Sequence, residues 1–138
     1  MNKMFDEHLE KLHDSRLYGF LLDWDSKLCK LNVLLYIHIF SEFNFELETY
    51  SLEKALVVFE NASIDRFSII NDLGSGQFYI NKYSVVDLGS GKYQFIFDFD
   101  SSIPELAITA ENILIKSSGF IKEEDKQFLS TNWLKLFE

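Results

Sequence analysis

The sequence predicts a protein of the α+β class that is mainly β. The expected fold is an antiparallel β-sheet meander, a curled sheet or half-barrel, with a short N-terminal helix and a C-terminal helix. Apolar residues recur at period two through much of the middle of the chain. Aromatic residues make up 16% of the chain, and such residues favour the half-buried surface of a sheet. A length of 138 residues with 47% hydrophobic content suits one domain, residues 1–138.

Helical spacing is confined to the two ends of the chain. Residues 3–12 place Met4, Phe5, Leu9 and Leu12 on one face, which predicts one short helix. The tail from Lys122 has an acidic start, as the helix dipole favours. Its apolar residues then recur at roughly helical intervals, at Phe128, Leu129, Trp133, Leu134 and Phe137. This pattern predicts a C-terminal helix or a pair of turns.

The clearest strand runs from residue 29 to residue 39. Its residues of one parity are apolar and share one face, namely Cys29, Leu31, Val33, Leu35, Ile37 and Ile39. Cys29 is expected to be a small buried hydrophobe on that face. Residues 17–24 precede this strand and join it through Asp25-Ser26-Lys27, a connection of hairpin length. The two segments should therefore pair antiparallel.

Further strands are predicted over residues 55–59 and 66–70, with a turn over residues 60–63. The string Asp-Leu-Gly-Ser-Gly occurs at residues 72–76 and again at residues 87–91, each time before an aromatic-rich strand. Glycine supplies the positive φ that a chain reversal needs. The repeat is therefore interpreted as two similar turns.

The strand after the second copy separates its two faces most clearly. One face should be core and carries Tyr93, Phe95, Phe97 and Phe99. The other carries Gln94, Ile96, Asp98 and Asp100. A last strand is predicted over residues 106–116, and Ser117-Ser118-Gly119 should end it.

The formal net charge of −9 repels phosphate backbones and anionic membranes, so direct nucleic-acid and membrane binding are not expected. The same charge would accelerate encounter with a basic partner. The single cysteine excludes an internal disulfide, and the N-terminus is too acidic for an export signal. The longest apolar stretch, residues 31–40, is too short to span a membrane. We expect a cytoplasmic protein.

Two motifs suggest catalytic or cofactor chemistry, and neither is complete. His13-Asp14 would suit a metal-dependent phosphohydrolase, but only His8 and His38 remain to supply further imidazoles. Asp14 or Ser15 is instead expected to end the helix and cap the turn into the first strand. The string at residues 89–92, Gly-Ser-Gly-Lys, lacks the remaining glycine and hydroxyl positions of a phosphate-binding loop. We expect no metal, no cofactor and no enzymatic activity.

Two alternative functions remain open. Carboxylate pairs such as Asp23 with Asp25, or Asp98 with Asp100, could serve a hydrolase as general acid and base. With 22 acidic residues in the chain, close pairs also arise by chance on a solvated face. Aromatic residues at period two could instead line the cavity of a small-ligand-binding β protein, although an ordinary core is the favoured explanation.

Several short motifs resemble those of small bacterial immunity proteins from polymorphic-toxin, contact-dependent inhibition and type VI secretion systems. They are Leu-His-Asp-Ser-Arg-Leu at residues 12–17 with Asp-Trp-Asp at 23–25, Val-Phe-Glu-Asn-Ala at 58–62, and Leu-Ala-Ile-Thr-Ala-Glu-Asn-Ile at 106–113. The resemblance spans roughly residues 12–116 and concerns turn and strand residues, so it carries over no catalytic residue. It implies a protein that binds and neutralises a cognate toxin, for which a basic nuclease would be a fitting target.

A binding surface follows as a hypothesis from the strand with two distinct faces. Asp98 and Asp100 should project away from the core, next to an acidic loop that carries Glu42, Glu46 and Glu48 if the sheet curls as a meander. These five residues are the candidate contacts to a basic toxin domain. The sequence does not indicate an oligomeric state.

Overall fold

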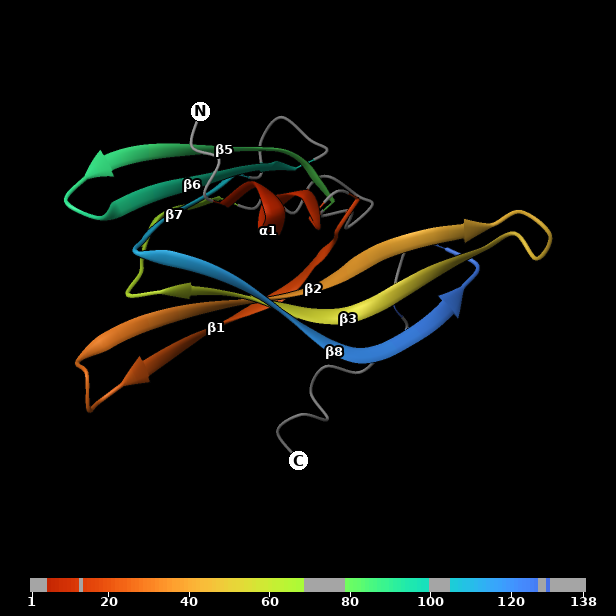
Figure 1. Cartoon of the computed structure of the whole chain (residues 1–138), viewed down its shortest axis with the longest axis horizontal. Coiled ribbons are helices and arrows are strands. Elements are labelled where there is room, and N and C mark those ends of the chain that lie inside the picture. Colours follow the sequence, from red (N-terminus) through yellow and green to blue (C-terminus); the bar gives the residue numbers. More distant parts are fainter. Residues whose placement is uncertain (1–4, 13, 69–78, 100–104, 127–128, 130–138) are drawn as a thin grey trace.

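The structure is a computed structural model, and it describes residues 5–12, 14–68, 79–99, 105–126 and 129 (Figure 1). One short helix, α1 (Asp6–Glu10), precedes eight strands. They are β1 (Leu17–Asp25), β2 (Lys30–Asn44), β3 (Thr49–Glu60), β4 (Ser63–Ser68), β5 (Ile80–Gly89), β6 (Lys92–Phe99), β7 (Glu105–Ala110) and β8 (Asn112–Glu124). The prediction of a mainly β, antiparallel protein with a short N-terminal helix is confirmed.

The strands form two four-stranded antiparallel sheets, in the orders β1-β2-β3-β8 and β4-β7-β6-β5. The expected single meander is therefore wrong, because the strands that follow one another as neighbours form two separate runs, β1–β2–β3 in one sheet and β5–β6–β7 in the other. The reason is the strand expected over residues 106–116. It is two strands, β7 and β8, which belong to different sheets and meet at Glu111.

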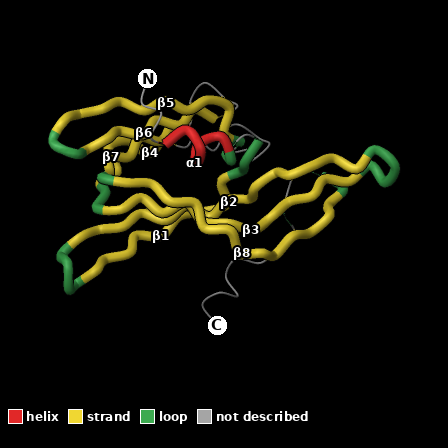
Figure 2. The backbone as a smooth tube through the Cα atoms, in the orientation of Figure 1, coloured by secondary structure: helices red, strands yellow, loops and turns green. Residues whose placement is uncertain are grey.

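The two sheets share a corner, which can be followed in Figure 2. The pair β3 and β8 lies in the first sheet, and the pair β4 and β7 continues it in the second. The chain turns from β3 into β4 at Asn61 and Ala62, and it returns from β7 into β8 at Glu111. At the other edges, the described residues form one antiparallel bridge, between Arg16 and Tyr79. The sheets are thus linked at both sides without forming one continuous ladder.

The core lies between the inner faces of the two sheets. Phe59 of β3 lies with its ring centroid 5.5 Å from that of Phe95 and 6.0 Å from that of Phe97, both on β6. Phe5, directly before α1, packs edge-on against Phe95 at 5.1 Å, and Leu9 and Leu12 are buried in the same cluster. The predicted separation of faces on β6 is confirmed for the described side chains, since Phe95 and Phe97 are buried and Asp98 is exposed.

Tertiary structure changes several local expectations. The predicted hairpin of residues 17–24 and 29–39 is present as β1 and β2, but Cys29 is exposed in its turn with φ of 52°. The loop expected around residues 42–48 is shorter and comprises residues 45–48, because β2 continues to Asn44 and β3 begins at Thr49. The strand β8 runs through Ser117-Ser118-Gly119 as far as Glu124 instead of ending there.

The remaining predicted elements are resolved in part. The second Asp-Leu-Gly-Ser-Gly string forms the hairpin turn between β5 and β6, where Gly89, Ser90 and Gly91 all have positive φ. The first copy, at residues 72–76, lies outside the described residues. The short strand expected at residues 66–70 is β4, which begins earlier, at Ser63. Lys122 to Glu124, where the C-terminal helix was expected to begin, lie in β8, and most of the rest of that segment is not described. Within the described part of the chain, no helix has the length and apolar character needed to cross a membrane.

Candidate functional site

The first sheet extends well beyond the second. Figure 1 shows β2, β3 and β8 continuing to the right, past the end of the second sheet and α1. We call this projection the acidic arm and define it as residues 41–53 and 120–126. It consists of the far part of the β2–β3 hairpin and the end of β8, which pairs with β3 from Tyr50 to Glu53.

The turn at the tip of the acidic arm is fixed by a side chain. The amide oxygen of Asn44 accepts hydrogen bonds from the backbone N–H groups of Glu46, at 3.0 Å, and Leu47, at 3.1 Å. Asparagine favours this local turn because its short side chain substitutes for a backbone acceptor. Glu48 completes the reversal with φ of 53°. The tip is therefore a defined turn that presents the side chains between Asn44 and Thr49.

Aromatic side chains stiffen the hairpin behind the tip. Phe43 and Tyr50 are direct cross-strand partners with ring centroids 4.8 Å apart. Phe45 packs edge-on against Phe43 at 5.0 Å, and Phe40 lies 6.0 Å from Tyr50. Such cross-strand aromatic pairs each contribute about 0.2–1 kcal/mol to a sheet. Phe45 nevertheless leaves 83% of its surface exposed, and its neighbour Leu47 leaves 64% exposed.

Carboxylates alternate with these exposed apolar side chains along the turn. Glu42, Glu46 and Glu48 are all exposed. Over the whole acidic arm, seven acidic residues stand against Lys122 and Lys126, which leaves a formal charge of −5 out of the −9 of the chain. One of the seven, Glu124, is internally neutralised by Lys122 at 3.4 Å.

An irregularity in β8 shapes the other side of the arm. Between the paired positions Glu53–Ile121 and Ala55–Ser117, β8 holds two more residues than β3, and Gly119 adopts φ of 79°. A carboxylate oxygen of Glu53 accepts the N–H of Gly119 at 2.8 Å, and the hydroxyl of Ser118 donates to the carbonyl of Lys54. This bulge leaves Phe120 and Ile121 exposed beside the acidic side chains.

The predicted contact residues fall on two different sheets. Glu42, Glu46 and Glu48 lie together on the acidic arm, whereas Asp98 lies on β6, between Lys82 of β5 and Glu105 of β7 in the ladder. The expected adjacency depended on a single curled meander, and the two-sheet arrangement does not supply it. Asp100 lies outside the described residues.

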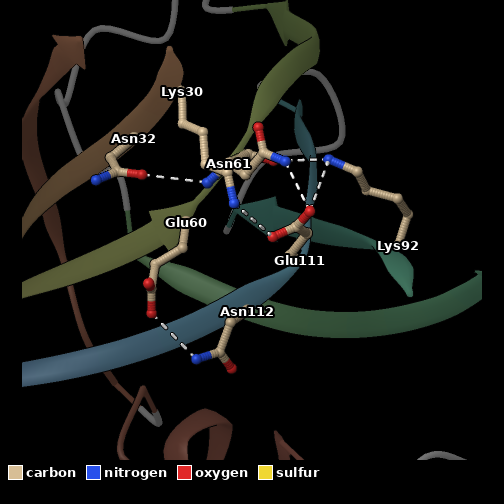
Figure 3. Close-up of polar contacts among 7 residues, drawn as sticks. All are labelled: Lys30, Asn32, Glu60, Asn61, Lys92, Glu111 and Asn112. Carbon is tan, nitrogen blue, oxygen red and sulfur yellow. Dashed lines mark hydrogen bonds and ion pairs between the residues drawn. The ribbon is translucent and has the colours of Figure 1, made fainter. Parts of the chain in front are cut away.

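A polar cluster holds the corner between the sheets (Figure 3). The amide nitrogen of Asn61 donates to Glu111 at 2.7 Å, and the ammonium groups of Lys30 and Lys92 lie 3.6 Å and 4.0 Å from the same carboxylate. The bond from Asn61, and secondarily the two lysines, hold the pKa of Glu111 below its ordinary value. These contacts join the β3–β4 connection at Asn61 to the β7–β8 connection at Glu111. The cluster therefore has a structural explanation.

A second polar group is buried beneath the first sheet. The Nε2 atom of His38 lies 3.0 Å from the carbonyl oxygen of Asp14, which can only accept, so Nε2 carries the proton. The Nδ1 atom must then accept the hydroxyl of Tyr18 at 2.6 Å, and the Tyr18 oxygen in turn accepts the N–H of Leu129 at 2.7 Å. Burial lowers the pKa of His38 to about 4 and raises the pKa of Tyr18 to about 12. The chain of bonds ties β1 and β2 to the backbone of Leu129.

The residues that were considered for a metal site or for a hydrolase were also located in the structure. Among the described residues, no group of three or more His, Cys, Asp and Glu side chains is close enough to hold a metal ion. Asp23 lies on β1, and the Asp25 carboxylate accepts the N–H groups of Lys27 and Leu28 in the β1–β2 turn. His13 is not described, and Asp14 has φ of 58°, in keeping with the turn residue that was predicted.

No protein-family model matches this chain, and no curated protein or solved structure is significantly similar to it. The geometry of the chain itself therefore has to support any functional assignment.

Phe45 and Leu47 were not among the residues that the sequence predicted to be functional. The missed signal is the order of residues around Asn44, where a turn-forming asparagine stands between the β-forming residues Phe43 and Tyr50. That order indicates a hairpin whose turn residues must face water.

Proposed function

We propose that this protein binds a basic partner through the acidic arm, and that the partner is a bacterial toxin domain which the protein neutralises. The observation that carries the proposal is the tip of the arm. Two largely exposed apolar side chains, Phe45 and Leu47, stand there, and the exposed Glu46 and Glu48 alternate with them along the turn.

The two kinds of side chain would act on different steps of binding. Exposed carboxylates raise the rate of encounter with a basic surface and exclude acidic partners. An aromatic side chain that enters a pocket of the partner supplies much of the affinity, because it loses a large water-exposed surface. The ordered turn and the aromatic pairs behind it hold Phe45 in place before binding, which lowers the entropy cost of association.

The resemblance to small immunity proteins supports the choice of partner. The small-ligand alternative has less support, since Phe5, Phe59, Phe95 and Phe97 pack against one another. The hydrolase alternative has less support because the Asp25 carboxylate accepts two backbone N–H groups of the β1–β2 turn, which explains this member of the Asp23–Asp25 pair structurally.

The test is binding of the purified protein to the purified toxin domain encoded by the neighbouring gene, measured by association kinetics. Phe45→Ser should weaken binding by about ten- to a hundredfold, mainly through faster dissociation. The pair Glu42→Lys with Glu46→Lys should slow association most strongly at low salt, because exposed charges are screened as ionic strength rises.

Asp98→Lys and Val86→Ser are the matched controls, since they alter an exposed charge and an exposed apolar residue on the second sheet. Both controls should bind like the unaltered protein. Binding that is insensitive to salt and to Phe45→Ser would contradict the proposal, as would an Asp98→Lys effect equal to that of the arm variants.

A further inference from the structure

In the part of the chain that the structure describes, the outer edge of β1 has no neighbouring strand beyond its start. β1 is the last strand of the first sheet, and the other side of it is β2. Among the described residues, the only bridge on its outer side joins Arg16 to Tyr79, just before β1 begins. The stretch from Phe20 to Asp25 pairs with β2 alone. Its outward backbone groups are therefore available to another strand.

Apolar side chains of this stretch are also exposed. Phe20, Leu22 and Trp24 are direct cross-strand partners of Leu35, Val33 and Leu31, respectively. Direct partners point to the same face of a sheet, so this row continues the core-facing side. Yet Leu22 is 53% exposed and Trp24 is 60% exposed. The second sheet contacts the row through Phe67 of β4, whose ring centroid lies 4.9 Å from that of Phe20.

The other sheet edges carry the features with which proteins prevent edge pairing. β8 has its bulge at Gly119 and an exposed Lys116, β4 presents Asp65 and Arg66, and β5 presents Lys82. Bulges and charged side chains, lysine above all, discourage the addition of a strand. The sequence of β1, Leu-Tyr-Gly-Phe-Leu-Leu-Asp-Trp-Asp, contains neither lysine nor proline. Its irregularity lies between Leu17 and Gly19, before the stretch from Phe20 to Asp25, and its charged side chains are those of Asp23 and Asp25. A row of exposed apolar side chains on such an edge is an expected surface for a strand partner.

We propose that the partner is a second copy of this chain, and that two β1 strands pair antiparallel about a two-fold axis near Leu22. In that register Leu22 faces the partner's Leu22 and Phe20 faces the partner's Trp24, so the apolar rows of both copies become continuous. Asp23 faces the partner's Leu21, and no carboxylate opposes another. Self-complementarity of this kind is what a two-fold interface requires.

The charge distribution permits self-association at this edge and opposes it at the arm. Residues 16–32 carry Arg16, Lys27 and Lys30 against Asp23 and Asp25, a formal charge of +1. The acidic arm lies at the opposite end of the first sheet from the β1–β2 turn (Figure 1). Pairing through β1 would send the two arms in opposite directions, which keeps their like charges apart and leaves both tips free.

The experiment is sedimentation equilibrium over a wide range of protein concentration, with Leu22→Lys as the test variant and Val86→Lys as its control. Val86 is an apolar residue of comparable exposure on the edge strand β5 of the second sheet. The unaltered protein and Val86→Lys should form dimers. Leu22→Lys should raise the dimer dissociation constant by roughly a hundredfold, because two ammonium groups would meet at the axis without a counter-charge.

Circular dichroism establishes that each variant is folded, and Trp24→Lys provides a second substitution on the same row. Hydrogen exchange of the dimer should protect outward amides between Phe20 and Asp25. The proposal is overturned if the unaltered protein stays monomeric, if a dimer survives both β1 substitutions, or if Val86→Lys dissociates it equally. A monomeric protein whose toxin binding is lost in Leu22→Lys would instead assign this edge to the toxin.

Discussion

His38 is a completely buried imidazole that the fold keeps neutral. Its two nitrogens are occupied by the carbonyl of Asp14 and the hydroxyl of Tyr18, and neither partner is an anion. Burial lowers the pKa of this histidine from 6.5 to about 4. The unfolded chain therefore binds the proton more readily than the folded chain between these two values.

This difference predicts how stability depends on pH. The contribution of His38 is complete above its unfolded pKa of 6.5 and is lost as the pH falls towards 4. A full shift of this size corresponds to about 3 kcal/mol. Denaturant titration between pH 4 and pH 7 should show a steeper loss of unfolding free energy in the unaltered protein than in His38→Gln. Because both proteins keep the same carboxylates, parallel pH profiles would refute the buried neutral state.

The neighbouring positions Phe97 and Asp98 should respond in opposite ways to a change of charge. Phe97 is buried against Phe59, whereas Asp98 is exposed on the other face of β6. Phe97→Asp should unfold the protein, since it places an unpaired charge in the core. Asp98→Lys should change the unfolding temperature little. Thermal unfolding of both variants tests this, and an unfolded Asp98→Lys beside a stable Phe97→Asp would mean that the two faces are reversed.

At the scale of elements, the corner between the sheets depends on one residue with left-handed backbone geometry. Asn61 has φ of 48°, and its N–H donates to the side-chain oxygen of Asn32 at 3.1 Å. Its carbonyl accepts the ammonium of Lys92 at 3.0 Å. A residue with this φ must be glycine, asparagine or aspartate to avoid strain.

Two substitutions at Asn61 separate the backbone from the side chain. Asn61→Gly keeps the backbone geometry and loses only the bond to Glu111. Asn61→Ala loses the same bond and adds left-handed strain, so it should be less stable than Asn61→Gly by about 1 kcal/mol. Urea unfolding of both variants measures this difference. Equal stabilities, or a more stable alanine variant, would show that the corner does not impose the left-handed geometry.

At the scale of the whole molecule, stability should be uneven along one pair of strands. Val33 to Ile37 and Val57 to Phe59 lie under the second sheet, with nearly complete burial of their inner side chains. The same strands then leave that cover and form the acidic arm. Amides near the tip should therefore exchange with solvent faster than amides of the covered part, because local opening there exposes less apolar surface. Residue-resolved hydrogen exchange measures the gradient, and uniform protection along β2 and β3 would contradict it.

Local sequence patterns predicted the structure correctly where the conformation depends on neighbouring residues alone. Alternation predicted β2 and the two faces of β6, and Asp87-Leu88-Gly89-Ser90-Gly91 predicted a reversal that the structure shows. Alternation failed at Cys29. The apolar pattern of β2 extends back to this residue, but Cys29 lies in the turn before the strand and its side chain is exposed. Alternation also failed to find the arm, whose strand residues 40–44 and 49–54 are not apolar on one face throughout.

What the sequence alone determined is the class of structure and the sign of the charge, since period-two patterning and acidic composition are properties of the chain itself. The tertiary structure decided which strands become neighbours. The change from one meander to two sheets takes place at Asn61 and Glu111, where strands distant in sequence meet, and no periodicity records such a meeting. The same long-range packing leaves Phe45 and Leu22 exposed while it buries residues of equal hydrophobicity such as Phe95 and Leu35. Exposure depends on what the rest of the fold places over a residue, so these surfaces appear only once both sheets are assembled.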